Sequence, residues 1–499
     1  MERTDVDLSL EQQQAFERYS AGDNVFLTGP GGTGKSLLVR KIYQDCKDRN
    51  KHVAVCALTG CAAVLLQCRA KTIHSWAGVG RCYGEQHKII ERVADNKFKR
   101  ANWKDADVLI VDEVSMMSRK LFEVLNNIAK LIKKSQQPFG GMQVLFIGDF
   151  FQLPPVGEKG EPDTTAFCFE SEEWFRVFPI ENNIQLKKIF RQEDDKYASA
   201  LNQIREGKIK KSAYELLMKQ VGKMPAADCL VQPTKLYPVR ASVDQINKQE
   251  LAKIDEEEHK FSVCRLHDLC NTGKKGRPQE IDFEFRYLEE SIPGDKEIVL
   301  KKGAQVMYTI NSQDTGLYNG SQGRVVGFSA TGMPIVKFRG IHVPLEVTPH
   351  TWPSEALPHI GVRQLPLILC WALTIHKAQG ATLEYAEIDV GSNVFESGQT
   401  YVALSRVKSI DGLFLTQFNY QKIITSKKVS EFYRRITSGE LPDPPAPAPQ
   451  QQTRKTGANT PSSQGPLPKT MPAATQNQLF NYFKLDPDLQ SALTLPVKR

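Results

Sequence analysis

The residues from 24 to 36 join an apolar run, a glycine-rich loop and a Lys-Ser pair, in an order that can bind a triphosphate. Gly29 to Ser36 fit the phosphate-loop pattern G-x-x-x-x-G-K-[ST]. Its glycines let the backbone take positive φ and turn N–H groups towards phosphate oxygens. Lys35 can reach the β and γ phosphates, and Ser36 can hold Mg²⁺. We therefore predict a nucleoside triphosphate site. Its predicted members are Gly29, Pro30, Gly31, Gly32, Thr33, Gly34, Lys35 and Ser36.

A second pair of reactive side chains follows the apolar run 108–111. Asp112 and Glu113 would lie at the carboxyl end of a buried parallel strand, where α/β sheets bind ligands. There Asp112 would bind Mg²⁺, and Glu113 would activate the water that attacks the γ phosphate. Adjacent carboxylates beside a buried strand are costly without such a role. The pair therefore predicts hydrolysis of the nucleotide as well as binding.

Four further side chains are candidates for contact with the nucleotide. Gln152 follows another apolar strand and can sense the γ phosphate. Arg191 and Arg406 are candidate arginine fingers, which stabilise charge on the γ phosphate in the transition state. Gln12 is expected in the first turn of a helix, where it would complete a capping box with Ser9. Because its amide both donates and accepts, Gln12 can also read an adenine edge.

Small, hydroxyl and aromatic residues near other strand ends are suited to nucleic acid. Thr59 follows the expected strand 53–58, where small side chains leave room for a sugar-phosphate backbone. His74 and Trp76 offer faces for base stacking, while a loop position for His74 and a core position for Trp76 are the alternatives. Phe151 is open to the same two interpretations. The net charge of +8 permits nucleic acid as a partner without establishing it.

Apolar strands that alternate with helical patterns predict an α/β fold, and 499 residues indicate two or more domains. We expect a first domain at 1–185, with a small surface insertion at 78–104, and a second domain at 186–437. Short alternating β runs with glycine turns at about 296–365 predict an inserted β-barrel. The apolar stretch 367–373 is expected to form one buried strand.

Composition excludes several classes of protein. No run of eighteen apolar residues occurs, so we predict no membrane span. The first seven residues are acidic and lack the apolar core of a secretory signal, and a mitochondrial transit peptide is not supported either. Ten cysteines are scattered without a Cys-x-x-Cys pair, which indicates reduced thiols inside a cell.

The C-terminal end of the sequence differs in composition from the rest. Residues 438–475 are rich in Pro, Gln, Ser and Thr and are predicted to be a disordered linker. The cluster Gln-Asn-Gln-Leu-Phe-Asn-Tyr-Phe at 476–483 follows it. Such an isolated apolar segment can fold on a partner, and docking on its own core is the alternative.

Taken together, these segments resemble the PIF family of superfamily-one helicases, which move 5′ to 3′ along DNA. The resemblance covers about residues 8–435. Gly-Asp-Phe-Phe-Gln-Leu-Pro-Pro-Val and Thr-Ile-His-Lys-Ala-Gln-Gly are highly specific to this family and its close relatives. The matching stretches are Gln12 with its flanks, Gly29–Ser36, Thr59–Ala63, Thr72–Gly78, Asp112–Met116, Gly148–Val156, Phe190–Gln192, Ala372–Leu383 and Tyr401–Arg406.

The resemblance implies two RecA-like domains with ATP between them, an SH3-like barrel and a strand-separating insertion. Single-stranded DNA would cross both domains, and closure on ATP would shift their two grips alternately. Glu384 would bond the ribose, and Gln379 and Gly380 would lie at the cleft. The predicted DNA contacts are Thr59, His74, Trp76, Phe151, Thr374, His376 and Lys377.

The C-terminal cluster resembles the motif that binds the sliding clamp PCNA, Gln-x-x-aliphatic-x-x-aromatic-aromatic. Gln476, Leu479, Tyr482 and Phe483 match it. The resemblance implies a clamp partner and, through it, a nuclear location or a viral or archaeal equivalent.

These observations favour an ATP- and Mg²⁺-dependent 5′-to-3′ DNA helicase of replication, repair or telomere maintenance. It would act as a monomer on single-stranded DNA and on forked or 5′-tailed duplexes. A DNA-stimulated translocase that displaces proteins or drives recombination, with little unwinding, is the first alternative. The second is a clamp-tethered DNA-binding protein without motor activity, which the intact set of nucleotide residues disfavours. That set is Lys35, Asp112, Glu113, Arg191 and Arg406.

Overall fold

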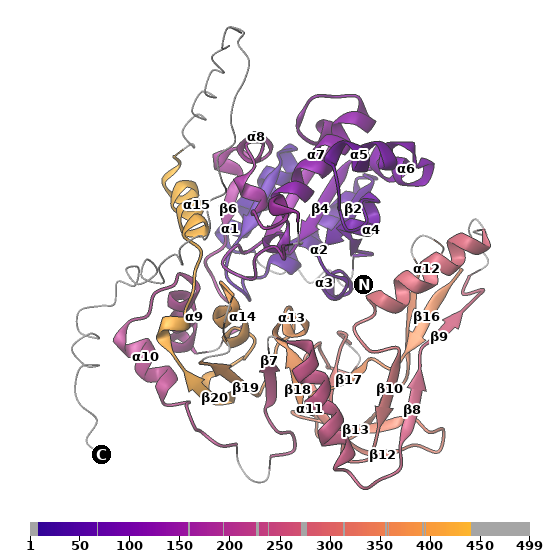
Figure 1. Cartoon of the computed structure of the whole chain (residues 1–499), viewed down its shortest axis with the longest axis vertical. Helices are drawn as coiled ribbons and strands as arrows, with labels where there is room; N and C mark the ends of the chain where they lie inside the picture. Colours follow the sequence, from indigo (N-terminus) through magenta and orange to yellow (C-terminus); the bar gives the residue numbers. More distant parts are fainter. Residues whose placement is uncertain are drawn as a thin grey trace, which may run out of the picture.

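Two α/β domains with parallel sheets and an inserted β-rich subdomain make up the described part of the chain (Figure 1). The computed structural model describes residues 8–440 except 67, 158–159, 193, 226–228, 238, 271–276, 313–314, 355–356, 358, 392–393 and 395. The predicted linker from 441 and the clamp motif 476–483 lie outside the described residues.

Six parallel strands form the sheet of the first domain, in the order β3-β2-β4-β5-β1-β6. The central strands are apolar and buried along their whole length, as expected of parallel strands covered on both faces. The strands are β1 (Val25–Thr28), β2 (Val53–Ala57), β3 (Lys71–Thr72), β4 (Val108–Asp112), β5 (Gln143–Gly148) and β6 (Asn183–Gln185).

Helices cover both faces of this sheet. Successive strand residues point to opposite sides, and the apolar residues on each side pack against helices. Val25 and Leu27 pack under α1 (Leu10–Ala21), α2 (Lys35–Asp48) and α3 (Gly60–Leu66), whereas Phe26 packs on the other side against Trp174. The helices of that second side are α4 (Ile73–Ala77), α5 (Gln86–Asp95), α6 (Lys97–Asp105), α7 (Arg119–Lys133) and α8 (Trp174–Val177). Short 3-10 turns are η1 (Val114–Met116), η2 (Pro138–Gly141), η3 (Pro162–Thr164), η4 (Cys168–Glu170) and η5 (Ile180–Asn182).

The predicted insertion 78–104 consists largely of α5 and α6. Ile89, Val93 and Trp103 belong to the same buried cluster as α7, so both helices are packed onto the first domain. The sequence suggested a polar surface segment, and the missed signal is the apolar spacing of Ile89 and Val93 along one helix face.

Four parallel strands form the second sheet, in the order β18-β7-β19-β20. The strands are β7 (Thr234–Tyr237), β18 (Ala372–Thr374), β19 (Ala386–Val390) and β20 (Leu413–Phe418). The helical segments of this domain are α9 (Asp195–Arg205), α10 (Lys211–Met218), α11 (Arg240–Ala252), α13 (Ile375–Ala378), α14 (Gln399–Leu404), η6 (Ile410–Gly412) and η7 (Tyr420–Lys422).

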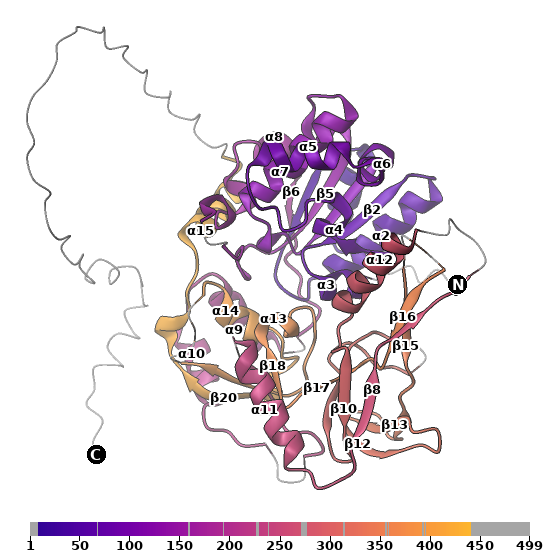
Figure 2. The same ribbon diagram turned by 45° about the vertical axis from the view of Figure 1, so that its right-hand side comes forward.

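The inserted subdomain is larger than the predicted 296–365. It begins with β8 and contains a long helix, α12 (Pro278–Ser291), which lies beside α3 of the first domain (Figure 2). Its main sheet has the order β14-β13-β12-β11-β17, and its pairings are antiparallel. The strands are β8 (His259–Ser262), β9 (Cys264–Leu266), β10 (Glu297–Leu300), β11 (Gln305–Tyr308), β12 (Gln322–Phe328), β13 (Pro334–Phe338), β14 (Leu345–Glu346), β15 (His350–Pro353), β16 (Gly361–Gln364) and β17 (Leu367–Leu369).

The stretch 367–373 is two strands, so the expectation of a single strand is wrong. β17 pairs antiparallel with β11 of the inserted subdomain, whereas β18 pairs parallel with β7 of the second domain. Continuous apolarity could not reveal the break, because both segments are buried.

The last described helix, α15 (Lys427–Ser438), returns to the first domain, which corrects the predicted domain boundary at 437. The ring of Phe432 lies 4.4 Å from the ring of Phe169 and 5.4 Å from that of Phe150, and Tyr433 stacks on Phe151 at 4.6 Å. The first domain is therefore built from two distant parts of the chain.

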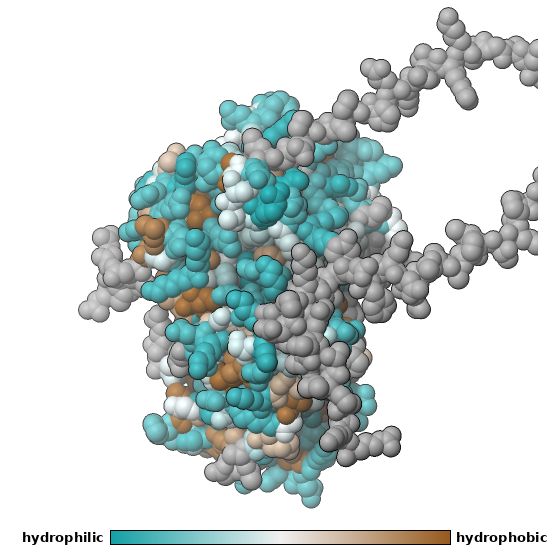
Figure 3. All heavy atoms as spheres, turned by 90° about the vertical axis from the view of Figure 1, so that its left-hand side faces the viewer, coloured by the Kyte–Doolittle hydropathy of each residue, from teal (hydrophilic) through white to brown (hydrophobic). Residues whose placement is uncertain are grey.

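The surface in Figure 3 is mainly hydrophilic, and its hydrophobic side chains form small separate groups. Among the described helices, none combines the length and apolarity needed to cross a membrane.

Candidate functional site

The phosphate loop joins the end of β1 to the start of α2, as the sequence predicts. A Cβ added to Gly32 would lie 2.4 Å from Cβ of Arg191, and one added to Gly34 would lie 2.6 Å from Nε2 of Gln12. Both glycines also have positive φ, at 84° and 80°. Lys35 Nζ donates to the carbonyl oxygens of residues 29 and 30 at 2.7 and 2.9 Å. The loop is thus folded tightly around its lysine, at the N-terminus of a helix, which favours anions.

Asp112 and Glu113 lie at the end of β4 and face this loop. Glu113 has a φ of 57°, which is rare for a residue with a side chain, and its N–H donates to Oδ1 of Asp112 at 2.8 Å. Burial and then the charge of Glu113 raise the pKa of Asp112 to about 7. Burial lowers the pKa of Lys35, although the negative charges of Asp149, Glu113 and Asp112 act to raise it. Two carboxylates and an ammonium group therefore share a poorly solvated space.

Arg191 and Arg406 converge on the phosphate loop from outside the first domain. A Cβ added to Gly31 would lie 3.4 Å from Nη1 of Arg191 and 3.5 Å from Nη2 of Arg406. The two guanidinium groups donate to uncharged acceptors, namely the Ser405 carbonyl and hydroxyl and the Val402 carbonyl. Burial and then the charge of Arg406 lower the pKa of Arg191 to about 9, and burial lowers the pKa of Arg406. Two cations held together in this way form a site for an anion of high charge.

Gln12 and Phe190 lie at the other end of the loop. Gln12 completes the predicted capping box with Ser9, and its Nε2 donates to the Thr33 carbonyl at 3.1 Å. The ring of Phe190 is half exposed, and its backbone N–H donates to the Gly32 carbonyl at 2.8 Å. An amide and an open aromatic face beside a phosphate loop are suited to a purine base.

These groups line one cavity of about 580 Å³ between the two α/β domains. It therefore brings together most of the nucleotide residues predicted from the sequence. The predicted residues that line it are Gln12, Gly31, Gly32, Thr33, Gly34, Lys35, Ser36, Asp112, Glu113, Gln152, Arg191, Gly380 and Arg406. Gln379 lines a small neighbouring cavity instead.

Known proteins match this chain over most of its length. The model of the PIF1-like helicase family matches residues 7–215. The ATP-dependent DNA helicase Pif1 of Bdellovibrio bacteriovorus is 33% identical over 437 residues, which cover 87% of this chain and 93% of that protein. The chain belongs to the PIF1-like helicase family. The ATP-dependent DNA helicase PIF1 of Emericella nidulans is 36% identical over 83% of this PIF1-like chain, which spans 61% of that relative.

A solved structure confirms the α/β fold of the PIF1-like chain. Bacteroides Pif1 in complex with ADP-AlF3 and single-stranded DNA matches with a TM-score of 0.57 and 26% identity. The match covers 87% of this chain and 98% of that one. This chain therefore shares an α/β fold with parallel sheets with solved Pif1 structures.

Glu384, expected at the ribose, does not line the cavity in this PIF1-like chain. Its Oε1 accepts from Tyr318 Oη at 3.0 Å, and its Oε2 accepts from Arg339 Nε at 2.7 Å. Both partners belong to the inserted subdomain, and Tyr318 itself lines the cavity. The sequence could not reveal this contact, because it joins residues 45 or more positions apart.

The predicted DNA-contacting residues do not gather at one open surface. Trp76 is buried against Trp103, with ring centroids 4.6 Å apart, and Phe151 is buried against Tyr433. In this conformation neither ring offers a free face to a base, so the core interpretation of both residues holds here. Their positions near strand ends are compatible with base stacking and with core packing, so the sequence could not distinguish the two.

The remaining DNA candidates are distributed along both α/β domains. Thr59 and His74 are half-buried, and burial lowers the pKa of His74. Thr374 Oγ1 accepts from the backbone N–H of Lys377 at 3.0 Å. Lys377 Nζ lies 3.6 Å from a carboxylate oxygen of Asp295. The side chain of His376 lies outside what the structure describes.

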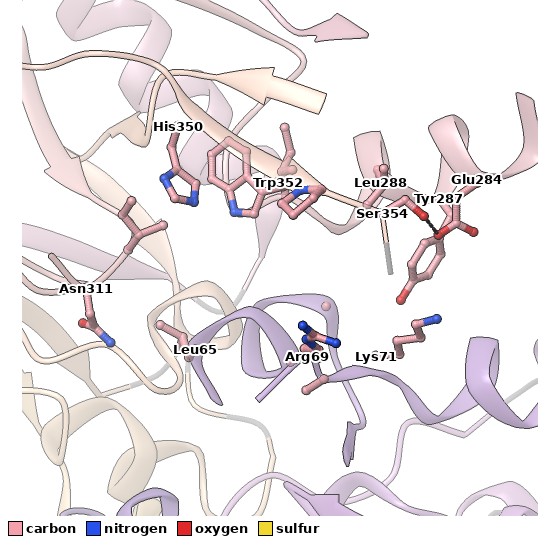
Figure 4. Close-up of a pocket in the computed structure, with 16 residues that line it drawn as sticks. Leu65, Arg69, Lys71, Glu284, Tyr287, Leu288, Asn311, His350, Trp352 and Ser354 are labelled. Carbon is pink, nitrogen blue, oxygen red and sulfur yellow. Dashed lines mark hydrogen bonds between the residues drawn. The ribbon is translucent and has the colours of Figure 1, made fainter. Parts of the chain in front are cut away.

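A second cavity, of about 570 Å³, lies between the first domain and the inserted subdomain. Figure 4 shows Arg69 and Lys71 on one side and His350 and Trp352 on the other. The rings of His350 and Trp352 are 4.7 Å apart, edge to face. Cations opposite aromatic rings are the groups that hold single strands of nucleic acid. Sequence reasoning missed these residues, because only the fold of the insertion brings them together.

Proposed function

We propose that this chain is an ATP-dependent DNA helicase that moves 5′ to 3′. The observation that carries the proposal is the convergence of Arg191 and Arg406 on the phosphate loop, next to Asp112 and Glu113. A triphosphate would stabilise such a site most, because its negative charges lie between two buried cations and neutralise them. Arginines placed across a domain boundary also make hydrolysis depend on how the domains are arranged.

In the proposed reaction, ATP lies between the two domains. Lys35 and the two arginines hold the phosphates, and Glu113 accepts a proton from the attacking water. Gln152 lies in the same cavity and is placed to report the presence of the γ phosphate. Gln12 holds the base edge, and the open ring of Phe190 stacks on the base.

The residues also suit Mg²⁺. The Ser36 hydroxyl and the Asp112 carboxylate line the same cavity, and hard oxygen donors are the ligands this ion prefers. The raised pKa of Asp112 is the expected state of a buried carboxylate that a cation would balance. Bound there, Mg²⁺ would supply charge neutralisation at the β and γ phosphates.

Single-stranded DNA is the proposed track, and it would pass through the second cavity. Arg69 and Lys71 would contact phosphates, while the exposed ring of His350, which packs edge to face on the buried Trp352, would contact bases. The DNA-bound state of Bacteroides Pif1 supports this partner class. Forked or 5′-tailed duplexes are the proposed natural substrates, with one chain acting as the motor.

The C-terminal motif is proposed to bind the sliding clamp PCNA, which would place the enzyme in the nucleus at sites of replication, repair or telomere maintenance. The support is the match of Gln476, Leu479, Tyr482 and Phe483 to the clamp motif. Replacing Tyr482 and Phe483 together with alanine should abolish clamp pull-down and leave ATPase activity unchanged. Full clamp capture by that variant contradicts the clamp proposal.

Measuring ATP hydrolysis with and without single-stranded DNA tests the motor. Unwinding of duplexes that carry either a 5′ or a 3′ tail tests its direction. We expect strong stimulation by DNA and unwinding from the 5′ tail alone. Stimulation without unwinding would favour a translocase that displaces proteins, and unwinding from the 3′ tail would reverse the proposed polarity. No hydrolysis at all would leave a clamp-tethered binding protein.

A further inference from the structure

Among the described residues of the inserted subdomain, Tyr318 is the one that lines the nucleotide cavity. This residue lies just before β12, yet it lines the cavity together with Thr382 and Lys408 of the second domain. The loop is held closely against the second domain, because a Cβ added to Gly320 would lie 2.2 Å from the Thr382 carbonyl oxygen. Gly320 also has a positive φ of 108°. The backbone around Tyr318 is therefore fixed at the edge of the cavity.

A hydrogen bond to the Glu384 carboxylate fixes the position of the Tyr318 hydroxyl. The hydroxyl donates to Glu384 Oε1 at 3.0 Å, and Arg339 Nε donates to Oε2 of the same carboxylate at 2.7 Å. Arg339 in turn donates to Tyr385 Oη at 2.6 Å, with its guanidinium 3.7 Å from the centre of that ring. Arg339 and Glu384 are about one-third exposed, at 32% and 30%. This chain of contacts orients the tyrosine from two separate parts of the fold.

The side chains at the two ends of the cavity suit two different parts of a nucleotide. Lys35, Arg191 and Arg406 hold phosphates at one end, and Gln12 and Phe190 suit the base at the other. A tyrosine hydroxyl backed by a carboxylate repels phosphate but bonds well to a neutral hydroxyl group. A sugar hydroxyl is the part of a nucleotide that fits this chemistry.

We propose that Tyr318 contacts the sugar of the bound nucleotide, and that Glu384 and Arg339 are positioning residues for its hydroxyl. The inference rests on the proposed function, since it assigns one contact within the same ATP site. It moves the expected sugar contact from the second domain to the inserted subdomain. Nucleotide binding and the position of the inserted subdomain are then linked, and each changes the free energy of the other.

The test compares equilibrium binding of ATP, 2′-deoxy-ATP and 3′-deoxy-ATP to the full chain without DNA. Tyr318→Phe keeps the ring and removes only the hydroxyl. A lost neutral hydrogen bond predicts roughly two- to tenfold weaker ATP binding and loss of the preference for ATP over one deoxy nucleotide. In DNA-stimulated hydrolysis the same variant should raise KM and leave kcat nearly unchanged. Tyr308→Phe, in the core of the same subdomain, is the matched control and should change neither quantity.

A second pair of variants tests the positioning residues. Arg339→Met should reduce sugar discrimination as Tyr318→Phe does, and Arg339→Lys should restore part of it. Unchanged discrimination in Tyr318→Phe, or equal binding of all three nucleotides by the unsubstituted chain, overturns the inference and leaves the helicase proposal intact. An unsubstituted chain that binds no ATP overturns both.

Discussion

Arg205 donates from Nε and Nη2 to the two carboxylate oxygens of Asp149, at 2.8 and 2.7 Å, across the boundary between the α/β domains. Asp149 directly follows β5 of the first domain, whereas Arg205 ends α9 of the second. The side chains are 0% and 4% exposed. Tyr433 of α15 adds a third bond, from its hydroxyl to Asp149 Oδ1 at 3.2 Å. One buried carboxylate thus joins both domains and the returning helix, in the same segment as Gln152, which lines the nucleotide cavity.

Replacing Arg205 with methionine should destabilise the chain strongly. Asp149 would then remain buried without its cation, a change that costs about 3–5 kcal/mol in comparable buried pairs. Denaturant unfolding measures the loss. Arg434→Met is the control, because its partner Glu431 lies on the surface, and such pairs contribute about 0–1 kcal/mol. Equal effects of the two substitutions would show that the buried pair has no special role.

Truncations should separate the returning helix from the segment beyond it. A chain that ends after Glu440 keeps α15 and should retain its melting temperature and its ATPase activity. A chain that ends before Lys427 loses Phe432 and Tyr433 from the buried aromatic cluster, so we expect a much lower melting temperature and poor soluble yield. Similar melting temperatures for both truncations would contradict the assignment of α15 to the first domain.

Glu113→Gln should abolish most ATP hydrolysis and leave ATP binding in place. A general base contributes roughly 100- to 10,000-fold to such reactions, so a fall of at least about 100-fold in kcat is expected. The steady-state rate with saturating single-stranded DNA measures it. Glu250→Gln, in α11, where the carboxylate pairs with Lys253, is the control and should retain the full rate. Full ATPase activity in Glu113→Gln would remove the assigned base.

Asp112 should make stability fall as pH rises. Its pKa is raised from 3.8 to about 7 in the folded chain, so between these values the folded state binds more protons than the unfolded state. This group therefore opposes folding increasingly as pH rises through that range, in the absence of nucleotide and Mg²⁺. Melting temperatures between about pH 5 and 8 should decline less steeply for Asp112→Asn than for the unsubstituted chain. Parallel profiles would show that Asp112 titrates normally.

Removing the two cations of the second cavity should weaken DNA binding. Arg69→Ala combined with Lys71→Ala should lower affinity for single-stranded DNA and reduce the salt dependence of binding by about one to two charges. Fluorescence anisotropy at several salt concentrations measures both quantities. Arg240→Ala with Lys248→Ala on α11 removes the same charge outside the residues that line this cavity. If both double variants bind alike, DNA does not pass through the cavity.

The candidate nucleotide site could be predicted because its residues are concentrated in short segments of the sequence. The loop around Lys35 and the pair Asp112–Glu113 carry their roles in local sequence, and parallel strands bring their ends together. Residue type alone made Arg406 a candidate, but nothing local places it beside Gly31. Contacts made by the inserted subdomain, such as Tyr318 with Glu384, depend on long-range packing that no local pattern encodes.

The core positions of two aromatic residues, in contrast, could not be predicted from local sequence. Trp76 and Phe151 occur where a base could stack, but their rings fill the core beside Trp103 and Tyr433. The partner of Phe151 comes from α15, at the far end of the described chain. Local patterns do not indicate that this helix returns to the first domain.

That return has a mechanical consequence. The chain enters the second domain after Gln185 and leaves it before Lys427, and both crossings are anchored in the first domain. Two fixed crossings define an axis, so the second domain can rotate about the line between them but resists sliding or separation. The same arrangement hinders exchange of that domain between two molecules, because both connections would have to open at once.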